Sequence, residues 1–161
     1  YTTLFRSYIT SPIIMSLLEA RLPIVSLTMM VQKEAAQRLC AAPGSREVGA
    51  VSIAVQYYSQ PQVLFQVSRG SFMPSPDVDS TVIRLDVRQQ PPVQLKKEED
   101  FFRVVKAAFS QRRKTLPNTL SAGLAIPKQQ ALDLLERAGV ASNLRAEQLS
   151  MQQFADIANA L

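Results

Sequence analysis

A stiff polar segment, Gln89-Gln90-Pro91-Pro92, divides the 161-residue sequence into two parts with different periodicities. Before it, apolar and polar residues alternate over 63–68 and 83–88, which is typical of strands. After it, apolar residues recur every three or four positions, which is typical of helices. Polar, proline-rich segments commonly link domains. The sequence therefore predicts an α/β part in residues 1–90 and a helical domain in residues 91–161.

The first part is predicted to form the closing strands of an α/β sheet with an antiparallel edge. The apolar run 24–31 suits a strand that is buried on both faces, as in a parallel sheet. The two alternating stretches are separated by the loop 69–78, and we expect them to pair as a hairpin. Helices are expected from the N-cap Ser11 to a point before Pro23, over 33–41 and over 49–58.

The second part is predicted to be entirely helical. Apolar residues share one side of each segment, and Gly139 provides a helix stop. The expected helices cover 98–110, 114–122, 128–138 and the residues that follow the N-cap Ser150.

Composition excludes several classes of site. The chain has one cysteine, Cys40, and no histidine, so an internal disulfide, a Cys/His zinc site and a Ser-His-Asp triad are excluded. A lone cysteine favours a reducing, cytoplasmic location. Glutamines and a proline interrupt the longest uncharged run, 48–68, so no membrane span is expected. Nor does the start of the sequence have the pattern of a signal peptide.

Basic residues are concentrated in one region. The net charge is +5, and residues 101–132 contain six basic residues and no acidic one. On one continuous helix, Arg103, Lys106, Arg113 and Lys114 would form a stripe that follows a phosphate backbone. Arg112 would fall on the apolar side, so either its side chain snorkels or the helix breaks near Gln111. The alternative to an RNA contact is an ordinary solvated basic face.

The loop 69–78 carries Phe72, followed by Pro74 and Pro76. Two prolines one residue apart hold a loop extended, and so fix the angle at which an aromatic ring is offered. Enzymes that act on a base pull it out of its stack, and an aromatic face commonly grips it. Phe72 is therefore a candidate for stacking on a nucleobase. The alternative is a core residue beneath the hairpin, which is the commoner fate of phenylalanine.

Two further clusters are weaker candidates. Gln32-Lys33-Glu34 follows an apolar strand, where α/β folds place ligands, but surface charges at a helix start are ordinary. Gln56-Tyr57-Tyr58 offers two rings to a nucleotide. However, Tyr58 lies at helical spacing from Val51 and Val55 and is more simply a core residue.

Motifs spread from about Tyr8 to Leu161 share one resemblance. They are Val31-Gln32-Lys33-Glu34 with Arg38-Leu39, Pro43-Gly44-Ser45, Gln56-Tyr57-Tyr58 with Phe65, Phe72-x-Pro74-x-Pro76-x-Val78-Asp79-Ser80, Phe109-x-Gln111-Arg112-Arg113-Lys114-Thr115-Leu116-x-Asn118-x-Leu120 and Arg145-x-Glu147-Gln148-Leu149-Ser150. In this order and rough spacing they resemble the KsgA-type rRNA adenine N6-dimethyltransferases. The proline loop and the Arg-Arg-Lys-Thr-Leu stretch together are the most specific part.

The resemblance implies the C-terminal part of a Rossmann-like, S-adenosylmethionine-dependent methyltransferase domain, followed by a small all-helical domain. It implies methyl transfer to the exocyclic amines of two adjacent adenines in small-subunit (16S) rRNA during ribosome biogenesis. The expected partner is that rRNA in the 30S subunit, and the protein is expected to be a monomer. Phe72 would lie against the target adenine. The residues expected to bind RNA are Arg103, Lys106, Arg112, Arg113 and Lys114.

The sequence also departs from the family. Where the family carries Asn-Leu-Pro-Tyr, this chain has Leu4-Phe5-Arg6-Ser7, and no Gly-x-Gly occurs anywhere in it. We therefore expect a truncated or wrongly joined C-terminal fragment that binds no S-adenosylmethionine and is inactive alone. One alternative is a non-catalytic RNA-binding or ribosome-assembly module. Another is a mitochondrial-type transcription factor derived from the same fold, against which the well-kept proline loop argues.

Overall fold

The computed structural model describes residues 10–161, and contacts divide the chain into two compact units. The sheet unit comprises the described residues up to Ala41 together with Ala54–Pro91, and the helical unit comprises Ala42–Ile53 together with Pro92–Leu161. No helix in residues 10–161 has the length and apolar character needed to cross a membrane. The elements in chain order are α1 (Thr10–Glu19), β1 (Ser26–Gln32), α2 (Lys33–Leu39), α3 (Ala50–Tyr58), β2 (Ser59–Val67), the 3-10 turn η1 (Arg69–Ser71), β3 (Ser80–Val87), α4 (Glu98–Ala108), α5 (Leu116–Leu124), α6 (Lys128–Arg137), the 3-10 turn η2 (Ala146–Gln148) and α7 (Met151–Asn159).

The sheet has the strand order β1-β3-β2, and both pairings are antiparallel. The predicted hairpin between the two alternating strands is confirmed, with an irregularity in register between Val63 and Phe65. The expectation that the first strand is buried on both faces, as in a parallel sheet, is wrong for the described residues. Strand β1 is antiparallel to β3, and Val31 is its one buried residue while Met30 is 51% exposed. An apolar run shows that a strand could be buried, but whether it is buried depends on which other segments pack against it.

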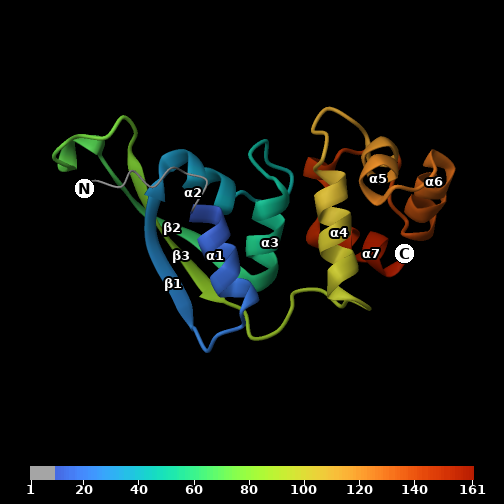
Figure 1. Cartoon of the computed structure of the whole chain (residues 1–161), viewed down its shortest axis with the longest axis horizontal. Helices are drawn as coiled ribbons and strands as arrows, with labels where there is room; N and C mark the ends of the chain where they lie inside the picture. The colour runs from blue at the N-terminus through green and yellow to red at the C-terminus, as the bar shows by residue number, and fades with distance from the viewer. Residues whose placement is uncertain (1–9) are drawn as a thin grey trace. The chain divides into compact units, whose positions relative to one another are not determined.

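Helices cover one face of the sheet in this unit (Figure 1). Alternation along β3 directs Thr81, Ile83 and Leu85 toward those helices, and all three are buried. Ile14 and Leu18 of α1 are buried as well, as helical spacing predicts. In α3 the buried tyrosine is Tyr57, whereas Tyr58, predicted to point inward, is half-buried.

The helical unit has a closed apolar core. Helix α4 packs against α5 and α7, and the Phe109 and Phe154 rings stack with centroids 5.8 Å apart. Helix α7 begins at the predicted N-cap Ser150, whose hydroxyl accepts a hydrogen bond from the Gln153 N–H. The fully buried large side chains of this unit are Ile53, Phe101, Leu116, Leu120, Leu134, Leu135, Leu149 and Phe154.

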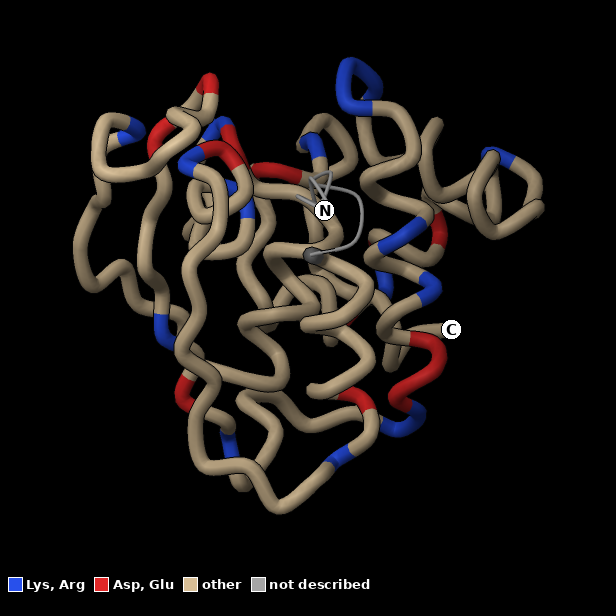
Figure 2. Tube along the Cα trace, turned by 60° about the vertical axis from the view of Figure 1, so that its left-hand side comes forward, with Lys and Arg blue, Asp and Glu red and all other residues tan. Residues whose placement is uncertain are grey.

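Helix α4 is shorter than predicted. It ends at Ala108 with Phe109 as C-cap, and the next helix begins only at Leu116. The basic run Arg112-Arg113-Lys114 therefore lies in the turn between α4 and α5. Figure 2 draws the Lys and Arg residues of the chain in blue. A single basic stripe along one continuous helix is wrong, and the alternative of a break near Gln111 is confirmed.

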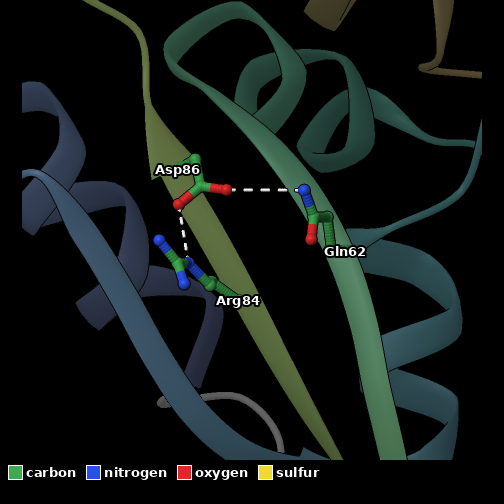
Figure 3. A network of polar contacts seen from close by, with 3 residues as sticks. All are labelled: Gln62, Arg84 and Asp86. Atoms are coloured by element: carbon green, nitrogen blue, oxygen red, sulfur yellow. Dashed lines mark hydrogen bonds and ion pairs between the residues drawn. The ribbon is translucent and has the colours of Figure 1, made fainter.

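The sheet face opposite the helices carries exposed polar and apolar side chains. Arg84 Nε lies 2.7 Å from Asp86 Oδ1, and Gln62 Nε2 donates to Asp86 Oδ2 over 3.4 Å (Figure 3). Apolar residues pair in the neighbouring part of this face, since Val82 is opposite both Met30 and Phe65. Phe65 is 57% exposed.

Candidate functional site

The loop between β2 and β3 is closed by hydrogen bonds of its own residues. The Arg69 N–H donates to Asp79 Oδ1 over 2.9 Å, which ties the start of the loop to its end. The Ser75 hydroxyl donates to the Arg69 carbonyl over 3.0 Å, and the Arg69 guanidinium donates to the Asp77 carbonyl over 3.2 Å. The loop is therefore shaped by polar contacts as well as by its prolines.

Phe72 follows η1 directly and its side chain is half-buried. It is therefore not one of the core residues of the sheet unit, although part of its ring is covered. The next residue, Met73, is fully exposed and joins Pro74 through a cis peptide bond. Sequence reasoning did not single out Met73, and its lack of any periodic pattern leaves no signal that could have identified it.

The structure brings the proline loop and the Gln32-Lys33-Glu34 cluster together. Gln32 pairs with Ser80, and the Lys33 N–H donates to the Asp79 carbonyl over 3.0 Å. A cavity of about 220 Å³ lies between the two segments. Its lining residues are Lys33, Glu34, Arg69, Asp77, Val78 and Asp79.

This cavity does not fit S-adenosylmethionine. Pockets that hold ligands of drug-like size are about 300–1,000 Å³ and mostly apolar, whereas this one is about 220 Å³ and has one apolar lining residue, Val78. Its charged residues comprise two cations and three carboxylates. No cofactor contact follows from these residues.

The Tyr57-Tyr58 pair lies at the other end of the sheet. The two rings meet edge to face with centroids 5.0 Å apart. Both line a cavity of about 490 Å³ with Val87 and Arg88, and these follow Asp86, which pairs with the first residue of β1. The structure therefore separates this pair from Phe72 within the sheet unit.

The five basic residues predicted to bind RNA have different surroundings. Arg103 pairs with Asp100, with Nη1 and Oδ1 2.9 Å apart. Arg112 donates through Nη2 to the Arg46 carbonyl over 3.1 Å and to the Val48 carbonyl over 2.9 Å. Within residues 10–161, no partner side chain engages the exposed groups of Lys106, Arg113 and Lys114. These last three are the most available for a phosphate.

Arg112 holds a second loop in place. Its contacts fasten residues 46–48 to the turn after α4, and the Gly44 N–H donates to the Glu147 carbonyl over 2.8 Å. A cavity of about 350 Å³ beside this loop is lined by Gly44, Ser45, Arg46, Arg145, Glu147 and Gln148. That Arg46 and Arg145 line one cavity could not be predicted from local patterns, since 99 positions separate them.

Comparison with known proteins agrees with the motifs. The family model described as ribosomal RNA adenine dimethylase matches residues 5–161. The chain belongs to this family. The match begins three residues before Tyr8, where the motif resemblance was expected to start. The departure at Leu4-Phe5-Arg6-Ser7 lies outside the described residues.

Curated relatives of the family have similar sequences. "Ribosomal RNA small subunit methyltransferase A" of Lachnoclostridium phytofermentans is 47% identical over 154 residues, which cover 94% of this chain and 53% of the relative. The protein of the same name from Desulfitobacterium hafniense is 49% identical, with coverage of 96% and 55%. The chain thus spans about half the length of the curated relatives it matches.

Solved structures of related enzymes show the same mixed α/β fold. A dimethyladenosine transferase from Plasmodium falciparum aligns with a TM-score of 0.79 at 25% identity, covering 93% of this chain and 62% of the other. The 23S rRNA methyltransferase ErmE aligns with a TM-score of 0.67 at 24% identity, covering 95% and 61%. The chain therefore has part of the fold of these rRNA methyltransferases.

Proposed function

We propose that the protein is an rRNA adenine N6,N6-dimethyltransferase that acts on adjacent adenines of small-subunit rRNA, with S-adenosylmethionine as methyl donor. Membership of the ribosomal RNA adenine dimethylase family over residues 5–161 is the observation that carries this proposal. The family's chemistry requires a methyl donor, and the cavity beside the proline loop, of about 220 Å³, is small for one. The chain spans about half the length of the curated relatives, so the part of the relatives that it does not match would supply the cofactor site, and this chain alone would be inactive.

The two units would have different tasks. The sheet unit would be the C-terminal part of the methyltransferase domain, and residues 91–161 would form a small helical RNA-binding domain. Phe72, half-buried on its braced loop, would stack on the adenine once the base has left its helix. The methyl transfer itself depends mainly on holding amine and methyl carbon in line, so a ring at a fixed angle contributes orientation.

A chimeric enzyme tests this proposal. The portion of the Desulfitobacterium hafniense relative that the chain does not match would be joined to this chain, and methyl transfer to small-subunit rRNA would be measured. We expect activity, about 5- to 150-fold lower for F72A because base stacking contributes about 1–3 kcal/mol. F65A is the matched control, since Phe65 is exposed on β2 of the same unit. An inactive but folded chimera would count against the proposal, as would equal losses for F72A and F65A.

A non-catalytic RNA-binding module is the second candidate, favoured by the three available basic side chains of Lys106, Arg113 and Lys114. The chain would be titrated with a small-subunit rRNA fragment at several salt concentrations. Removing two phosphate contacts in the R113A/K114A double variant should reduce the slope of log affinity against log salt by about 1.4–1.8. The control K97A/K128A removes the same charge elsewhere. RNA binding with an inactive chimera would favour this candidate, whereas salt-independent binding would eliminate it.

A further inference from the structure

Asp79 connects three segments of the sheet unit at the base of the proline loop. Its carboxylate accepts the Arg69 N–H over 2.9 Å, across ten positions of sequence. Its carbonyl accepts the Lys33 N–H over 3.0 Å, at the first residue of α2. The next residue, Ser80, begins β3. One residue thus fixes the start of the loop relative to both α2 and the sheet.

Phe72 is one short turn away from this anchor. The Phe72 N–H donates to the Arg69 carbonyl over 3.3 Å, within η1. That carbonyl also accepts the Ser75 hydroxyl over 3.0 Å. Both contacts depend on the orientation of Arg69, and the bond to Asp79 constrains that orientation. A shift of Arg69 would therefore be transmitted to the Phe72 ring.

We propose that Asp79 is a positioning residue that sets the angle of the Phe72 ring relative to the end of β1. The inference rests on the proposed function, because it concerns the ring that would meet the adenine. A ring fixed before binding loses little conformational freedom when it stacks, so preorganisation favours both affinity and correct orientation. Asp79 acts only through Arg69 and does not itself touch the base.

The chain contains no tryptophan, which provides a direct probe. In an F72W background, fluorescence comes from a single indole at the position of interest. Its residual anisotropy reports ring motion, and its quenching by single-stranded oligoadenylate reports stacking. D79A removes the acceptor for the Arg69 N–H, whereas D79N keeps an acceptor oxygen without the charge. D77A is the matched control, because the Asp77 contact in the loop uses its main-chain carbonyl.

We expect D79A to lower the residual anisotropy and to weaken the binding of oligoadenylate, followed by quenching, about fivefold, the effect of one net hydrogen bond. D79N should restore most of both signals, and D77A should leave both unchanged. Thermal unfolding by circular dichroism would show that these variants remain folded. If D79A does not fold, D79E displaces the carboxylate by one methylene and takes its place.

Two outcomes would overturn the positioning role. One is an anisotropy that is the same in D79A and in its F72W parent, and the other is an equal change in D77A. Failure of the proposed function gives a different result, namely no quenching of the F72W parent by oligoadenylate. In that case the anisotropy comparison still decides whether Asp79 holds the ring.

Discussion

The two units differ in how completely they bury their apolar side chains. Of the ten exposed large hydrophobic residues in the described chain, nine lie in the sheet unit, and the tenth is Leu161. Of the twelve largest fully buried side chains, eight lie in the helical unit. The helical unit thus satisfies its own apolar surface, whereas the sheet unit leaves one face and parts of β1 and β2 exposed.

This difference implies that the two units respond differently to the loss of an aromatic ring. Phe154 is fully buried, and F154A should lower the free energy of unfolding by about 3–5 kcal/mol through lost transfer energy and a residual cavity. Phe65 is 57% exposed, and F65A should change it by less than about 0.5 kcal/mol. Urea titration followed by circular dichroism measures both. A large loss in F65A would show that the open sheet face is covered in solution.

The close approach of α4 and α5 provides a second test of how tightly the helical unit is packed. A Cβ added at Gly123 would lie 2.5 Å from Cα and Cβ of Ala107, so α4 and α5 would have to move apart. G123A should therefore destabilise the protein by about 1–3 kcal/mol, the usual cost of overpacking. G49A is the control, because an added Cβ there meets nothing within 4 Å. Equal midpoints of urea unfolding for both variants would contradict such tight packing.

The sequence predicted the helical unit better than the sheet unit. Local signals located the start of α6 at Lys128 and the N-cap Ser150, because periodicity and capping depend on neighbours along the chain. The burial of β1 was mispredicted because it depends on which strands and helices cover it. The meeting of Lys33 with Asp79 was also missed, because sheet pairing brings distant residues together.

The predicted basic stripe was wrong for a related reason. Residues up to Ser110 fit a helix by pattern, but α4 ends at Ala108 and the Arg112 guanidinium reaches the Val48 carbonyl, 64 positions away. Charge and the family resemblance grouped Arg112 with Arg113 and Lys114 as RNA contacts, although their surroundings differ. Phe72 was correctly recognised as a residue of the proline loop, but its role in stacking stays a prediction.

The smallest predicted effect on stability is that of R112A, which is compared with R113A. R112A removes two hydrogen bonds to main-chain carbonyls of residues 46 and 48, and should destabilise the helical unit by about 1 kcal/mol, since the guanidinium is partly solvated. R113A removes the same charge from an exposed side chain and should leave unfolding unchanged within about 0.5 kcal/mol. If Arg113 contacts a phosphate, R113A should instead affect RNA binding. It should reduce the slope of log affinity against log salt concentration by about 0.7–0.9. Identical unfolding curves for the two variants would show that Arg112 does not brace the loop.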